Sequence, residues 1–137
     1  MLSILSFPLD ENSSFIKGCS KAPSQILKAF KSESSNMFSE NGFNCGNDEQ
    51  VCILDTLELQ SGKTAIDQIK NAVKKELVKS KNIVSIGGDH SITYPIIEAY
   101  SNDFESLNIL HFDAHPDLYN NFNDNPYSHA SPFARIM

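Results

Sequence analysis

Residues 82–91 read NIVSIGGDHS, and residues 107–117 read LNILHFDAHPD. Each is an apolar segment that ends in acidic and histidine side chains, as expected for buried strands with a binding site at their carboxyl ends. Imidazole and carboxylate together suit a borderline-hard divalent metal such as Mn²⁺, Fe²⁺, Co²⁺ or Zn²⁺. If 107–113 is a strand, its alternation places Asp113 and His115 on one side. These segments therefore predict a metal site at strand ends.

The remaining sequence alternates between strand and helix patterns. Strands are predicted at 2–7, 51–59, 82–88 and 107–115, and helices around Ile26–Phe30, Ile66–Leu77 and Pro95–Ser101. The helices show apolar residues at helical spacing, and the stretch 31–50 is polar and has the weakest pattern. Such alternation implies an α/β fold with a mostly parallel sheet and helices on both faces.

Composition narrows the class of protein. The 137 residues are one domain's length, and 40% apolar content is sufficient for a core. A net charge of −6 with 11 basic residues argues against nucleic acid or an anionic membrane as a partner. No segment approaches the roughly 18 apolar residues of a membrane span. The three cysteines form no Cys-x-x-Cys pair and the N-terminus lacks signal-peptide features, so a cytoplasmic location is expected.

Several motifs together resemble one known family. They are FPLD (7–10), GCSKAPSQI (18–26), GGDHS (87–91), DAHPD (113–117) and SHASPF (128–133). These motifs resemble the arginase/agmatinase (ureohydrolase) family of binuclear manganese enzymes. The resemblance implies the three-layer α/β/α arginase/deacetylase-type fold, N-terminal half only. Residues 1–137 would be a partial ureohydrolase domain that lacks the family's later Asp-x-Asp strand.

The resemblance also implies a role for five residues. Asp113 would bridge two Mn²⁺ ions, and His115 would complete the coordination shell of one of them. His90 and Asp117 would bind the other ion. His129 would lie near the substrate and transfer protons, which suits an imidazole that titrates near neutral pH.

Two positions leave alternatives open. His111 shares the predicted strand face of Asp113, and is either an outer partner of the metal ligands or a packed strand residue, so it stays outside the predicted site. Tyr119 stands where arginase-like members carry an Asn that grips the substrate's α-carboxylate. Tyr119 therefore favours an agmatinase-type substrate, although Asn120 and Asn121 lie close enough for a register shift to restore that grip.

The resemblance thus implies a manganese hydrolase that converts a guanidino compound and water into urea and an amine. Agmatine is the first expected substrate, which would place the protein in polyamine metabolism, with arginine, guanidinobutyrate or formiminoglutamate as alternatives. A homo-oligomer, trimer or hexamer, is expected. Two divalent cations carry more charge than Asp113 and Asp117 balance, so an inactive or truncated metal-binding fragment is the alternative function. A zinc deacetylase on the same fold would use a single metal without the paired GGDHS motif.

Overall fold

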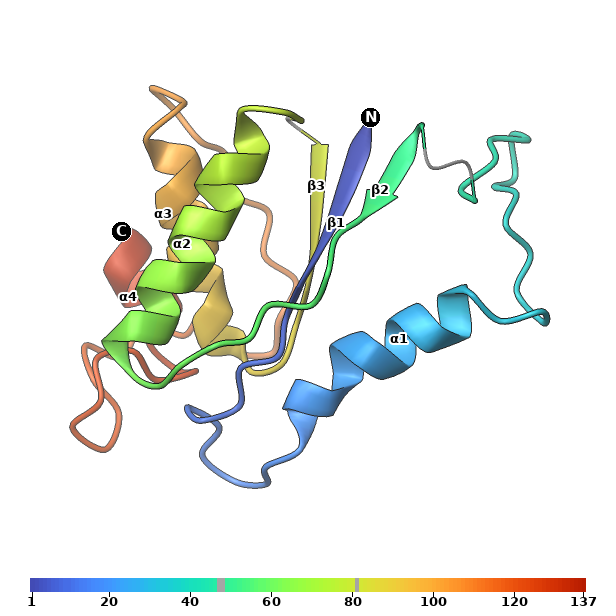
Figure 1. Cartoon of the computed structure of the whole chain (residues 1–137). Coiled ribbons are helices and arrows are strands. Elements are labelled where there is room, and N and C mark those ends of the chain that lie inside the picture. Colours follow the sequence, from blue (N-terminus) through green and yellow to red (C-terminus); the bar gives the residue numbers. More distant parts are fainter. Residues whose placement is uncertain (47–48, 81) are drawn as a thin grey trace.

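The computed structural model describes residues 1–46, 49–80 and 82–137. Three strands, β1 (Leu2–Phe7), β2 (Val51–Ile53) and β3 (Asn82–Gly87), form one parallel sheet in the order β2-β1-β3 (Figure 1). The expected strands at 2–7 and 82–88 are confirmed to within one residue. The expected strand at 51–59 is wrong beyond Ile53, because its later residues follow β1 only through isolated contacts such as the hydrogen bond from Leu57 N to Ser6 O at 3.3 Å.

Helices cover both faces of this sheet (Figure 1). α2 (Lys63–Leu77) and α3 (Thr93–Ser101) pack together on one face, and α1 (Ala22–Phe30) lies on the other. All three correspond to expected helices. A short α4 (Pro132–Ile136), which the sequence pattern does not predict, packs near α3. The molecule is therefore a three-layer α/β/α arrangement, as expected from the alternation of strands and helices.

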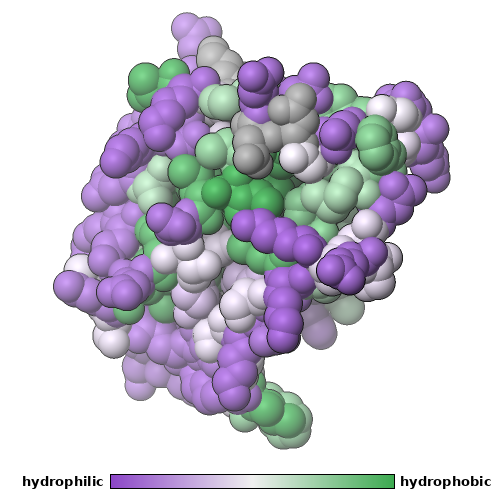
Figure 2. All heavy atoms as spheres, turned by 45° about the vertical axis from the view of Figure 1, so that its right-hand side comes forward, coloured by the Kyte–Doolittle hydropathy of each residue, from purple (hydrophilic) through white to green (hydrophobic). Residues whose placement is uncertain are grey.

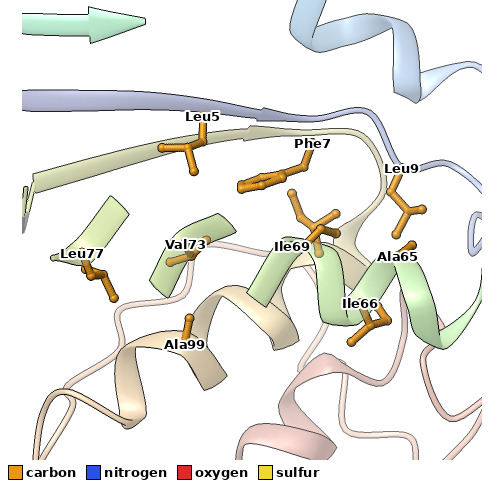
Figure 3. Close-up of a cluster of buried hydrophobic side chains, with 10 residues drawn as sticks. Leu5, Phe7, Leu9, Ala65, Ile66, Ile69, Val73, Leu77 and Ala99 are labelled. Atoms are coloured by element: carbon orange, nitrogen blue, oxygen red, sulfur yellow. The ribbon is translucent and has the colours of Figure 1, made fainter. Parts of the chain in front are cut away.

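The core lies between β1 and α2 (Figure 3). Leu5 and Phe7 alternate with a serine along β1 and point towards Ile69 and Val73, which recur at helical spacing on α2. All four side chains are 2% exposed or less. Burial of each such side chain stabilises the fold by roughly 1.5–3 kcal/mol, so this contact holds β1 in the middle of the sheet.

A buried polar pair joins the same two elements. Ser3 Oγ donates to Glu76 Oε1 at 2.7 Å, and the two residues are 0% and 4% exposed. This hydrogen bond is the main reason that the pKa of Glu76 lies below its ordinary value of 4.5, and Lys79 Nζ, 3.1 Å from Oε2, acts in the same direction. The pair therefore stabilises the fold above about pH 4.5, and the contribution is lost as pH falls through the lowered pKa.

We expect Ser3→Ala to lower the free energy of unfolding by about 1–3 kcal/mol at neutral pH, because it leaves a buried carboxylate oxygen unpaired. The difference from wild type should shrink at about pH 3, where Glu76 becomes protonated. Urea denaturation at both pH values measures this. Ser34→Ala, at an exposed loop position, is the control. A loss in Ser3→Ala that is unchanged at low pH would contradict the assignment to Glu76.

The sheet face on the side of α1 is only partly covered. Ile4 and Val84 are register partners and so point to the same face, opposite to Leu5. Val84 is 43% exposed and Ile26 of α1 is 48% exposed. Figure 2 shows apolar surface, bordered by hydrophilic side chains, on the side of the molecule that carries α1. Among the described residues, no helix is long and apolar enough to cross a membrane.

The expected strand at 107–115 is wrong for this structure. Within the described ranges this segment pairs with no strand, and Leu110 and Phe112 are 80% and 88% exposed. A strand exists only where a neighbouring strand supplies hydrogen-bond partners, and β3 does not pair with this segment. The apolar run that indicated a buried strand is real, but in the described residues it forms no ladder with β3, whose outer edge is unpaired.

Candidate metal centre

The GGDHS loop is set by its contact with the end of β1. Gly88 N donates to Phe7 O at 3.1 Å, and Asp89 N donates to Leu9 O at 2.8 Å. A Cβ atom at Gly88 would lie only 1.9 Å from the carbonyl oxygen of Leu9. Only glycine permits this close approach of two backbones, and the approach determines where the next residues lie.

We expect Gly88→Ala to displace the loop, to lower stability by about 1–3 kcal/mol and to weaken binding of Mn²⁺, because the Cβ atom collides with backbone. Gly87→Ala is the matched control. Its Cβ atom would meet the side chain of Ile92 and no backbone atom, so the loop itself is not displaced directly. Thermal unfolding and bound Mn²⁺ per chain measure both effects. Equal behaviour of the two variants would refute the role of the Gly88 contact.

Asp89 orients the residue that follows it. Asp89 is 6% exposed, and its Oδ1 atom accepts hydrogen bonds from Ser91 N at 2.9 Å and from Ser91 Oγ. These bonds cap a 3₁₀ turn, His90–Ile92, that leads into α3. The Nδ1 atom of His90 lies 3.1 Å from Thr93 Oγ1, so its Nε2 atom faces away from the helix.

Four potential metal ligands converge beside this turn. They are His90, His111, Asp113 and Asp117, and one ligand atom from each lies within 4.8 Å of the others. The His90 and His111 rings are stacked, with centroids 5.6 Å apart and an angle of 6° between planes. His90 Nε2 is 3.2 Å from Asp117 Oδ2, and His111 Nε2 is 3.5 Å from Asp113 Oδ2. A divalent cation takes this kind of nitrogen and oxygen donor set.

Asp117 reaches the cluster through an unusual backbone conformation. Its φ is 47°, in the left-handed region that non-glycine residues seldom adopt, and the residue is 9% exposed. Phe133 N donates to Asp117 O at 3.2 Å, and Tyr119 N donates to Ala130 O at 3.2 Å. These bonds from the 128–133 segment hold the strained residue in place. Such strain concentrates at functional sites.

The cluster fits a metal on the chemistry of its atoms. His90 Nε2 and His111 Nε2 are buried and, within the described part of the chain, make no hydrogen bond of acceptable geometry despite the nearby carboxylates. Burial lowers the pKa of His90 below 6.5, against the opposing effect of Asp117 and Asp113, and the backbone N–H of His115 lowers the pKa of Asp113 below 3.8. Neutral imidazole and ionised carboxylate are the forms that bind metal.

His115 lies outside the four-residue cluster in this structure. The chain bends at 114–115, and His115 N donates to Asp113 Oδ1 at 3.0 Å. The His115 side chain is 78% exposed, and its Nδ1 atom is 3.7 Å from Asp113 Oδ1. The strand alternation that would have placed both side chains on one face is absent, because the segment is unpaired. A ligand role for His115 stays a prediction.

His111, which the sequence analysis kept outside the predicted site, lies in the cluster. It precedes Asp113 by two residues, and an extended chain places such residues on the same side. The alternation was therefore a usable signal. An apolar strand setting made a packed histidine an equally good interpretation, and only the contact with His90 distinguishes the two.

His129 lies on a different segment, beside the loop that follows β1. Its Nδ1 atom is 2.8 Å from Asn12 O, and its Nε2 atom is 3.2 Å from Ser14 Oγ. The Phe122 ring meets its ring edge-on, with centroids 5.7 Å apart. His129 is half-buried, and none of its hydrogen bonds involves a residue of the cluster. His129 therefore lies apart from the four-residue cluster, and a proton-transfer role for it stays a prediction.

The chain is similar in sequence to known proteins over its whole length. The model of the arginase family matches residues 1–137. The chain is 38% identical to "Arginase, mitochondrial" of Medicago truncatula, over 98% of this chain and 43% of that protein. It is 33% identical to "N(1)-aminopropylagmatine ureohydrolase" of Thermus thermophilus, over 98% of this chain and 46% of that protein.

A solved structure is also similar to this chain in its fold. The arginase structure from Medicago truncatula superposes with a TM-score of 0.86 at 36% identity, covering 99% of this chain and 46% of that chain. The 137 residues thus span somewhat less than half the length of the curated relatives they match.

Proposed function

This chain belongs to the arginase family, and from that premise we propose that it contributes the N-terminal part of a metal-dependent hydrolase of linear amidines. The observation that supports the proposal is the convergence of His90, His111, Asp113 and Asp117 at the end of the sheet. In the proposed reaction, water attacks the guanidino carbon of the substrate, and urea and an amine leave. Divalent cations, Mn²⁺ by resemblance, would supply Lewis acidity and lower the pKa of a water towards neutrality.

The residues of this chain would divide the work between two segments. His90, Asp113 and Asp117 would hold the cations, with His115 as a further ligand by resemblance. Asp113 lies between the two histidines that flank it, with one oxygen 3.5 Å from His111 Nε2 and the other 3.7 Å from His115 Nδ1. By resemblance, Asp113 would be the residue that holds both cations. His129, outside the cluster, would transfer protons.

We propose that the remaining ligands come from sequence beyond these 137 residues. Residues 1–137 together with that further sequence are called the complete domain below. The relatives are more than twice as long. Two carboxylates leave much of the charge of two divalent cations unbalanced, and uncompensated charge in a crevice is unfavourable. Residues 1–137 alone should therefore bind Mn²⁺ weakly. Weak binding without activity is also what the alternative function, a metal-binding fragment, would show.

For the substrate we propose agmatine first. Tyr119 is 62% exposed and offers no amide to an α-carboxylate. Matched relatives carry the names arginase and aminopropylagmatine ureohydrolase, so arginine and extended agmatines belong in the same assay. Asn120 and Asn121 are exposed beside Tyr119 and would be the residues to grip a carboxylate if arginine is the substrate. The expected cytoplasmic location and homo-oligomeric state stay predictions.

The test is urea release by the complete domain after Mn²⁺ loading, with agmatine, arginine and guanidinobutyrate as separate substrates. Residues 1–137 alone are the parallel sample. We expect urea from one of the three with the complete domain, and weak Mn²⁺ binding without turnover from the shorter chain. If no substrate gave urea while the metal was shown to be bound, the proposed urea-releasing activity would be wrong. Turnover by residues 1–137 alone would refute the proposed division of the site.

A further inference from the structure

Asn12 connects three segments that are far apart in the sequence. Its backbone N–H donates to Asp89 Oδ2 at 2.9 Å, and its side-chain Nδ2 donates to Ser91 Oγ at 2.9 Å. Its side-chain Oδ1 accepts from Asn125 Nδ2 at 2.7 Å. All these bonds are at least partly buried. The loop after β1 is thereby tied to the GGDHS loop and to the 122–128 segment.

The carbonyl oxygen of Asn12 determines the protonation of His129. It lies 2.8 Å from His129 Nδ1, and a carbonyl can only accept, so Nδ1 must carry a proton. In the neutral ring the lone pair then sits on Nε2. Ser14 Oγ is 3.2 Å from Nε2 and must be the donor in that contact. Nε2 is therefore the nitrogen that can accept a proton.

Ser128 does not determine the tautomer in this way. Its Oγ atom also lies near Nδ1, at 3.3 Å, but a hydroxyl can either donate or accept. The same oxygen accepts from Ala130 N at 3.3 Å. Both His129 tautomers would satisfy Ser128, whereas only one satisfies Asn12. The tautomer thus depends on where the Asn12 carbonyl is held.

We propose that Asn12 is a positioning residue for His129: its carbonyl fixes the Nδ1–H tautomer, and its side chain holds that carbonyl by bridging Ser91 and Asn125. The inference rests on the proton-transfer role proposed for His129. The bond to Ser91 also fixes His129 relative to the loop that carries His90. A proton-transfer group with the wrong tautomer or position loses most of its effect, because it must lie within hydrogen-bond distance of the proton before its pKa matters.

The tautomer is measured directly on residues 1–137 with ¹⁵N-labelled histidine, from the ring nitrogen shifts at about pH 8, above the ordinary histidine pKa of about 6.5. Wild type should show His129 protonated at Nδ1. Asn12→Ala should shift the population to a mixture of both tautomers. Ser14→Ala should leave the tautomer unchanged, because it removes only the donor to Nε2. Asn36→Ala is the matched control, since its Oδ1 caps Phe38 N in an exposed loop.

Asn125→Ala removes one of the two side-chain bonds and should give a smaller shift of the same sign, which keeps the test available if Asn12→Ala unfolds. In the complete domain, Asn12→Ala should lower kcat roughly 10-fold, less than the 10²–10⁴ of losing general acid–base catalysis itself. KM and bound Mn²⁺ should stay near their wild-type values.

Three results would overturn the proposal: Nε2–H in wild type, an unchanged tautomer in both asparagine variants, or a tautomer controlled by Ser14→Ala. A parallel rise in KM and loss of metal in Asn12→Ala would also overturn it, because that pattern describes general disruption. The tautomer result does not depend on turnover. If the metal-loaded wild type releases no urea while the tautomer shifts as expected, the function fails and the hydrogen-bond assignment stands.

Discussion

In the complete domain, Asp113→Asn is expected to abolish tight Mn²⁺ binding, with a loss in affinity above the roughly 10–100-fold typical of an outer-shell substitution. The amide keeps the size of the side chain but loses the negative charge and one acceptor oxygen. Asp113 lies near His111 on one side and His115 on the other. Loss of its carboxylate would therefore affect a cation held with either histidine. Calorimetric titration with Mn²⁺ and metal content after gel filtration measure the loss.

Asp103→Asn is the matched control for that change. Asp103 is exposed in the turn after α3, and its backbone N–H donates to Tyr100 O at 2.9 Å. This variant should bind Mn²⁺ as wild type does. If Asp113→Asn retained wild-type affinity, or if Asp103→Asn lost as much, Asp113 would not be the bridging ligand.

A pair of histidine variants separates the two candidates beside Asp113. If His115 binds metal, as the family resemblance implies, His115→Ala should lose as much Mn²⁺ as His90→Ala. His111→Ala should then retain most of its metal and lose mainly the stacking on His90. If His111→Ala lost more metal than His115→Ala, the ligand would be His111, which is the histidine that lies in the cluster of the described residues.

His129→Ala is expected to lower turnover of the complete domain by about 10²–10⁴, the usual contribution of a positioned general acid or base. Bound Mn²⁺ should be unchanged, because His129 makes its hydrogen bonds to the Asn12 loop and not to the cluster. Steady-state urea release and metal content on the same preparation separate the two effects.

Phe122→Leu serves as the control for His129→Ala. It removes the ring that meets His129 edge-on, at 5.7 Å between centroids, but leaves the imidazole in place. Its turnover should fall far less than that of His129→Ala. If His129→Ala released metal as completely as Asp113→Asn does, the division between cation binding and proton transfer would be wrong.

The sequence alone determined most of the helices and two of the strands. Period-two and helical apolar patterns located β1, β3, α2 and α3, because a side chain's burial follows directly from its place on a strand or helix. The GGDHS and DAHPD motifs also contain three of the four potential metal ligands that lie together in the structure, His90, Asp113 and Asp117. These patterns are local, because residues that are close in the sequence are enough to produce them.

The tertiary structure decided the rest. The segment 107–115 has the composition of a strand, but within the described residues it pairs with no other segment. Pairing is a property of two segments, so no local pattern could reveal this outcome. For the same reason His111 turned into the cluster while His115 faces solvent. Asn12 carries no sequence signal of its own. Its role arises because folding brings Asp89, Asn125 and His129 within hydrogen-bond distance of one loop.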